Sequence, residues 1–71
     1  MQENGNTLKV NGKEYPHLPD MTVTTLLDAV RTEVGSIVVE LNAVIIPREH
    51  FGETPLNPGD LVEIVHFVGG G

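Results

Sequence analysis

Only one stretch of this chain has the periodicity of an amphipathic helix, and segments patterned as strands stand on both sides of it. Its apolar residues fall at offsets of 0, 3, 4, 7 and 11 and form a single stripe: Val23, Leu26, Leu27, Val30 and Val34. The stripe predicts a helix of about three turns, capped at its start by the Thr22 hydroxyl and ended at Gly35. One such helix among strands restricts the chain to a two-layer α+β domain in which the helix covers one face of a sheet.

The segment before the predicted helix reads as a hairpin. Residues 7–10 alternate with the two-residue period of a half-buried strand, and Asn11-Gly12 follows as a turn whose two residues tolerate positive φ. The second strand is expected to run through Tyr15 and Leu18, and its two prolines confine it to an edge or an end of the sheet.

The segment after the helix predicts two further strands and a helical turn. Residues 36–41 are rich in β-branched side chains that alternate between two faces, Asn42-Ala43 forms a tight turn, and residues 44–46 form a short strand. Pro47 then starts a single helical turn that carries Phe51 into the core.

The last strand is predicted over residues 61–68, after a turn at 57–60 in which Pro and Gly occupy the two central positions. If Val62 and Ile64 face the helix, the alternate row faces solvent or a partner and forms a docking surface: Leu61, Val65 and Phe67. The opposite row is the buried one if the sheet curls the other way.

Charge and composition narrow the possible partners. Ten acidic residues against four basic ones give a net charge of −6, so the chain is expected to bind neither nucleic acid nor an anionic membrane. The acidity suits a partner with a basic docking face and is equally explained by solubility. The polar start, without an apolar leader or a membrane-length apolar run, predicts a cytoplasmic protein.

The sequence argues against catalysis by this chain alone. It has no cysteine, so disulfides, thiolate metal sites and cysteine nucleophiles are excluded. Its histidines, His17, His50 and His66, are far apart and lack a second ligand at metal-binding spacing, so we expect them to be structural or solvated. We therefore predict no catalytic residue, no metal site and no cofactor bound by the chain itself.

Three consecutive glycines follow the last predicted strand. Because glycine has no Cβ, Gly69, Gly70 and Gly71 can thread a narrow channel and present the α-carboxylate of Gly71 to an enzyme. ATP can activate such a carboxylate as an acyl-adenylate, which a sulfur or nitrogen nucleophile then attacks. The plainer interpretation is a frayed, mobile end. The expected organisation is a disordered lead-in over residues 1–6, one domain over 7–68 and a flexible tail over 69–71.

Three stretches of the sequence carry a family resemblance. They are the Val10-Asn11-Gly12 turn, the Val44–Phe51 run with its Ile-Pro-Arg-Glu core, and Pro58-Gly59-Asp60 leading into the last strand and the glycine end. With these motifs the chain resembles the ThiS family, the β-grasp (ubiquitin-like) sulfur carriers of thiamine biosynthesis. The resemblance spans about residues 7–71 and implies one helix packed on a mixed four- to five-stranded sheet.

The resemblance also implies a chemical cycle at the tail. A ThiF-type adenylating enzyme would use ATP and Mg²⁺ to activate the Gly71 carboxylate, and a persulfide would supply sulfur to form a thiocarboxylate for thiazole synthase. Gly70 would let the tail enter the partner, whereas the role of Gly69 is less constrained. We interpret Arg48 and Glu49 of the middle motif as structural.

Three other functions stay open at this point. The chain could carry sulfur for molybdopterin or another pathway, could be a modifier joined through Gly71 to lysines, or could be a β-grasp binding module whose tail does no chemistry. Removal of Gly70 and Gly71 separates these classes, because only the binding module would keep its function.

Overall fold

The computed structural model describes residues 6–30 and 36–67. Within them the chain forms five strands, one α-helix and one 3₁₀-helix, in the order β1 (Thr7–Val10), β2 (Lys13–Pro16), α1 (Val23–Ala29), β3 (Ile37–Leu41), β4 (Val44–Ile46), η2 (Arg48–Glu53) and β5 (Leu61–His66).

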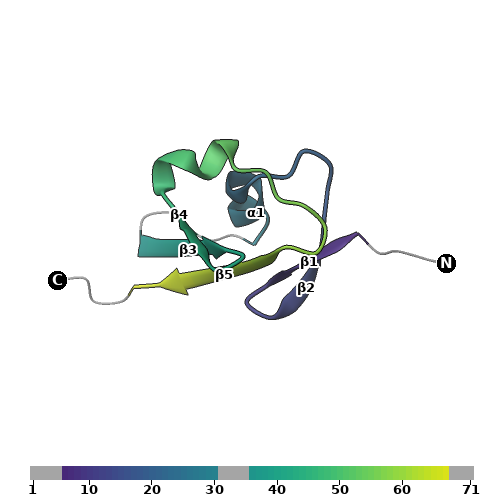
Figure 1. Cartoon of the computed structure of the whole chain (residues 1–71), viewed down its shortest axis with the longest axis horizontal. Coiled ribbons are helices and arrows are strands. Elements are labelled where there is room, and N and C mark those ends of the chain that lie inside the picture. The colour runs from purple at the N-terminus through teal and green to yellow at the C-terminus, as the bar shows by residue number, and fades with distance from the viewer. Residues whose placement is uncertain (1–5, 31–35, 68–71) are drawn as a thin grey trace.

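The five strands form one mixed sheet in the order β2-β1-β5-β3-β4. The β1–β5 pair is parallel, and the β1–β2, β3–β5 and β3–β4 pairs are antiparallel. Figure 1 shows α1 and η2 on the same side of this sheet. The predicted β-grasp architecture is confirmed, with five strands and with the last described strand at the centre of the sheet.

The core lies between the sheet and the two helices. Its side chains are nearly inaccessible to solvent and come from every layer of the fold: Leu8, Val10, Met21, Val23, Leu26, Leu27, Ile37, Val39, Phe51, Leu56, Val62 and Ile64. Phe51 enters it from η2, as the sequence predicts, although η2 extends over six residues where one turn was expected.

The start of α1 follows the sequence prediction closely. The Thr25 backbone N–H donates to Thr22 Oγ1 at 3.3 Å, and the Thr22 backbone N–H donates to Thr25 Oγ1 at 2.8 Å. This reciprocal pair satisfies two donors that a helix start leaves unpaired. The described helix ends at Ala29 with Val30 as its C-cap, and the predicted continuation to Val34 and Gly35 lies outside the described residues.

Both hairpin turns place two successive residues at positive φ. The first turn has Asn11 at 51° and Gly12 at 85°, and the second has Asn42 at 51° and Ala43 at 71°. Such turns match the right-handed twist of the strands that they join. Ala43 carries a Cβ in this left-handed region, which costs roughly 1–2 kcal/mol for an L-residue.

Two strands end earlier than the sequence predicts. β2 ends at Pro16, and Leu18 lies beyond it with 55% of its side chain exposed. The chain must turn there toward Met21, which is buried, and the His17 ring donates to the Leu56 carbonyl at that turn. β5 ends at His66 rather than Val68, although the Phe67 N–H still donates to the Ser36 carbonyl at 2.9 Å.

Candidate functional site

The two rows of β5 side chains have opposite environments. Val62 and Ile64 are 1% and 7% exposed beneath the helices. The alternate row lies on the face away from α1, with Leu61, Val65 and Phe67 exposed by 54%, 47% and 58%. The predicted exposure of Leu61, Val65 and Phe67 is confirmed, which excludes the alternative in which this row is the buried one.

Neighbouring strands extend this row into a larger surface. Val38 of β3 lies directly opposite Val65, and Ile45 of β4 lies opposite Glu40 on the same face. Ile45 is 61% exposed, and Val38 is half-buried. We name these residues the outer patch: Val38, Ile45, Leu61, Val65 and Phe67. Exposed apolar side chains gathered on one face are typical of a protein interaction site.

Charged residues on this face are paired differently at its two ends. Lys9 of β1 lies opposite Glu14 of β2, so opposite charges are matched there. Glu40 of β3 lies opposite Glu63 of β5, so like charges face each other among the apolar residues of the outer patch. Across the described ranges, no ion pair within 4 Å involves either of these two glutamates.

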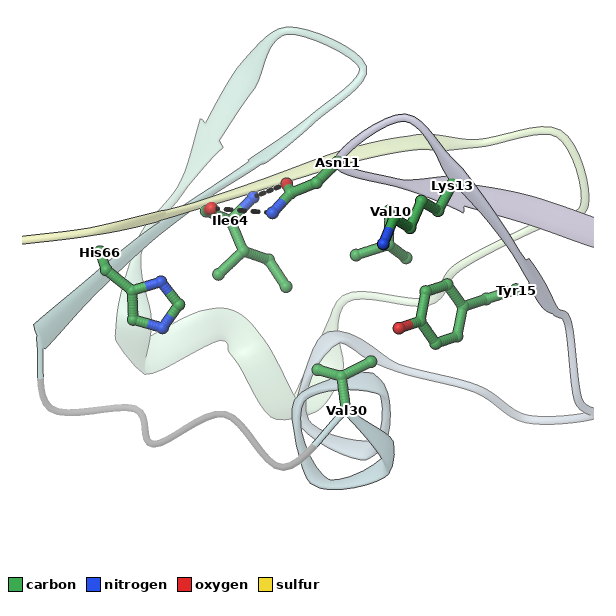
Figure 2. Close-up of a pocket in the computed structure, with 7 residues that line it drawn as sticks. All are labelled: Val10, Asn11, Lys13, Tyr15, Val30, Ile64 and His66. Carbon is green, nitrogen blue, oxygen red and sulfur yellow. Dashed lines mark hydrogen bonds between the residues drawn. The ribbon is translucent and has the colours of Figure 1, made fainter.

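Asn11 fixes β5 from one side. Its Nδ2 donates to the Ile64 carbonyl at 3.2 Å, and its Oδ1 accepts from the Ile64 N–H at 2.7 Å, as Figure 2 shows. The paired residues of β1 and β5 end at Val10 and Val62, so the Asn11 amide extends the hydrogen bonding along β5 by one more pair of bonds. The Asn11 N–H also donates to the Val62 carbonyl at 2.8 Å.

Asn42 fixes β5 from the other side. Its Oδ1 accepts from the Leu61 N–H at 3.0 Å, and its backbone N–H donates to the Leu61 carbonyl at 2.7 Å. Its Nδ2 donates to Asp60 Oδ1 at 3.1 Å. From the sequence, both asparagines are predicted only as turn residues. Asparagine at the first position of both positive-φ turns was the signal available in the sequence.

A cavity of about 210 Å³ lies on the helix side of the sheet, next to the end of β5. Figure 2 shows Tyr15, Val30 and His66 around it, with Ile64 and Val10 along the sheet. Lys13 and Asn11 complete the lining. The described part of the chain holds no group of three His, Cys, Asp or Glu residues able to bind a metal ion. The cavity therefore offers apolar contact beside a few polar groups.

The three histidines lie in separate places, and two of them have identifiable structural contacts. His17 Nε2 contacts the Leu56 carbonyl, and His50 Nδ1 contacts a Glu53 carboxylate oxygen within η2. His66 borders the cavity. The expectation of a structural histidine is confirmed for His17.

The Val44–Phe51 stretch, the middle motif, forms the edge strand β4 and the first part of η2. Arg48 and Glu49 are exposed in the first turn of η2, and they line a groove of about 360 Å³ with the end of β4. Pro47 caps η2 without a side-chain hydrogen bond, and Phe51 anchors it. No helix within residues 6–30 and 36–67 is long and apolar enough to cross a membrane.

The predicted tail residues, Gly69, Gly70 and Gly71, lie outside the described residues, so their predicted roles stay predictions. The last described residue is Phe67, which belongs to the outer patch. In sequence, the predicted tail therefore begins two residues after the last residue of the exposed apolar surface.

Comparison with known proteins decides the family. A family model described as "ThiS family" matches residues 8–71. The chain belongs to the ThiS family. It is 42% identical over 65 residues to the sulfur carrier protein ThiS of Bacillus subtilis, with 90% of this chain and 98% of that protein covered. The stretches that carry the resemblance in the sequence thus belong to a ThiS-family chain.

A solved structure and a longer relative extend the comparison. The crystal structure of the thiamine biosynthesis protein ThiS from Geobacter metallireducens has a TM-score of 0.76 and 38% identity, covering 92% of this chain and 99% of that one. A thiazole synthase of Paramagnetospirillum magneticum is 38% identical over 64 residues. The match covers 90% of this chain and only 20% of that synthase, so the chain spans about a fifth of its length.

Proposed function

We propose that this ThiS-family chain is a sulfur carrier of thiamine biosynthesis that bears sulfur on the Gly71 carboxylate. The observation that carries the proposal is the family membership over residues 8–71, together with near-complete coverage of the B. subtilis sulfur carrier. The absence of cysteine supports it, because no side chain could hold a persulfide.

The proposed chemistry has two steps at the Gly71 carboxylate, the first at one of its oxygens and the second at its carbon. A ThiF-type enzyme with ATP and Mg²⁺ joins a carboxylate oxygen of Gly71 to the α-phosphate and releases pyrophosphate. A sulfur nucleophile then forms a carbon–sulfur bond and expels AMP. With hydrosulfide the product is the thiocarboxylate itself. With a persulfide donor the product is an acyl disulfide, and a thiol reductant must cleave its S–S bond to release the thiocarboxylate.

The acceptor in this proposal is thiazole synthase. The similarity to the thiazole synthase of Paramagnetospirillum magneticum described above supports a relation between this fold and thiazole formation, because that match and the match to the sulfur carrier each use 90% of the present chain. The carrier itself catalyses no step. It presents a slim tail to two enzymes in turn, and the folded domain serves as the handle that they bind.

The outer patch is the proposed contact with the adenylating enzyme. Its side chains are exposed, and Phe67 lies only four residues before Gly71. An enzyme that holds the patch would hold the start of the tail at a fixed distance from its ATP site. This arrangement would lower the entropic cost of bringing the carboxylate to the phosphate.

Intact mass spectrometry tests the proposal. The chain is incubated with ATP, Mg²⁺, a ThiF-type enzyme and sodium sulfide, and the mass increase of one sulfur replacing one oxygen, mapped to Gly71, is expected. The Gly71 deletion should remove that product. If none of the adenylating enzymes tried converts the wild-type chain to this product, the result would contradict the proposal and favour a binding module.

Two glycine substitutions make a matched pair. Gly70→Ala adds a Cβ within the proposed tail and should slow adenylation. Gly52→Ala adds one in η2, where the nearest atom is Thr24 Oγ1 at 3.7 Å, an ordinary contact, and should leave the rate unchanged.

The alternative functions predict other results. Carrier–lysine conjugates in cell extracts would favour a protein modifier. A growth requirement for molybdenum-enzyme products rather than thiazole would favour a molybdopterin carrier.

A further inference from the structure

Two glutamates face each other across the centre of the outer surface. Glu40 of β3 and Glu63 of β5 are direct partners in the antiparallel register. Side chains in this relation have Cβ atoms about 4.5–5.5 Å apart, and like charges there destabilise the sheet. The half-buried Glu40 and the exposed Glu63 therefore oppose the pairing of the two strands that carry them.

Nothing among the described residues compensates this repulsion by a close ion pair. The basic residue of this face nearest in register is Lys9, which lies opposite Leu61, two positions from Glu63. Lys9 is also the direct cross-strand partner of Glu14. A local conflict of this kind between two paired strands is expected at a surface with a function.

Apolar side chains frame the two carboxylates. Along β5, Leu61 and Val65 stand on either side of Glu63 in the exposed row, and across β3 and β4, Ile45 is the neighbour of Glu40. A partner that covered this frame would exclude water from the carboxylates. Their charge would then need a basic group, and a guanidinium can donate to both carboxylates through its fixed set of N–H groups.

We propose that the outer patch, with Glu40 and Glu63 at its centre, is a docking surface for a protein that inserts an arginine side chain between the two carboxylates and packs apolar residues around it. The inference rests on the proposed function, because the partner is the adenylating enzyme that must hold the carrier by this surface. It assigns the two glutamates to partner recognition at a cost to the stability of the free chain.

The proposal predicts opposite effects on binding and on folding, which a purely structural role would not produce. In the Glu40→Gln/Glu63→Gln double variant, the KM for the carrier in pyrophosphate release should rise about tenfold or more, with kcat nearly unchanged. The urea midpoint of the same variant should rise, because the repulsion between the strands is gone. Glu14→Gln makes the same change on the same face, away from the patch, and should leave KM unchanged.

Salt gives a second measurement. The KM of the wild-type carrier should rise between low and high ionic strength, and the double variant should show a smaller rise, because two of the attractive charges are absent. An unchanged KM in the double variant, or a raised KM with a lowered urea midpoint, would overturn the inference while wild-type adenylation still stood. Absence of pyrophosphate release with the wild-type chain would instead overturn the proposed function and the inference together.

Discussion

The two β-hairpins flank β5 from opposite sides and are built on the same plan. β1–β2 and β3–β4 each turn through an asparagine at φ 51°, and each asparagine hydrogen-bonds the backbone of β5. Asn11 contacts Ile64 and Asn42 contacts Leu61. The central strand is thus held by a side-chain amide from either neighbour.

The hairpins differ in what they present to solvent. The first hairpin has matched charges, Lys9 with Glu14, and its edge strand ends in Pro16, which offers no N–H to another chain. The second has Glu40 opposite Glu63, and its edge strand exposes Val44 and Ile45 by about 60%. The first hairpin pairs its own surface charges. The second hairpin leaves apolar and acidic side chains exposed, and a partner protein can contact them.

Loss of either asparagine amide should have the largest effect on the stability of the two hairpins. Asn11→Ala and Asn42→Ala each remove side-chain hydrogen bonds to the β5 segment and place a Cβ-bearing residue without a polar group at positive φ. Each is expected to lower the free energy of unfolding by about 2 kcal/mol, measured by urea denaturation. Asn11→Gly, which relieves the backbone, should cost less. Equal losses for Asn11→Gly and Asn11→Ala would show that backbone strain contributes little.

Removal of the aromatic ring at the end of the outer patch should come next. Phe67→Ala is expected to raise the carrier's KM about tenfold, roughly 1.4 kcal/mol, while changing the urea midpoint little, since the ring is 58% exposed. Leu18→Ala is the matched control, because Leu18 is 55% exposed in the loop after β2. A similar KM change in both variants would count against a localised docking surface.

The second residue of each turn gives a smaller and opposite pair of effects. Gly12→Ala should destabilise the chain by about 1 kcal/mol, since a Cβ there meets no atom within 4 Å and the cost is that of positive φ alone. Ala43→Gly should stabilise it by about 0.5 kcal/mol, because relief at φ 71° outweighs the greater freedom of glycine in the unfolded chain. Thermal unfolding of both variants at one pH measures the difference.

Exchange of the surface charges should give the smallest effects. Lys9→Glu creates a like-charge pair with Glu14, and Glu63→Lys creates an opposite-charge pair with Glu40. The first should lower and the second raise the free energy of unfolding, each by about 0.5 kcal/mol in low salt. Both changes in the free energy of unfolding should be smaller in about 0.5 M salt, because the screening length there is only a few ångströms. Shifts of the same sign in both variants would show that the register does not govern these pairs.

Local chemistry made much of the fold predictable. The positive φ of Asn11 and Gly12, the reciprocal cap at Thr22 and Thr25, and the glycine turn before β5 all depend on neighbours in sequence. The alternation along residues 61–67 predicted which side chains of β5 are exposed, because the strand period fixes the face once one row is buried.

Contacts between distant segments were not predictable in the same way. The pairing of Glu40 with Glu63 and the reach of Asn11 to Ile64 join residues 23 and 53 positions apart, and no pattern within either segment specifies the partner. The end of β2 at Pro16 was missed for a related reason. Directly after Pro16, the His17 ring contacts the Leu56 carbonyl, 39 positions away in the sequence.

The place of β5 between the hairpins also bears on how the chain reaches its folded state. β1 and β3 are not neighbours in the sheet, and both depend on β5 for their connection. A nascent chain that lacks residues 61–66 can form at most two separate two-stranded ribbons, which are marginal in water. Closure of the sheet must await the last strand, and the long sequence separation of β1 and β5 slows it. The strand that precedes the predicted glycine tail is therefore also the one whose synthesis allows the five-stranded sheet to close.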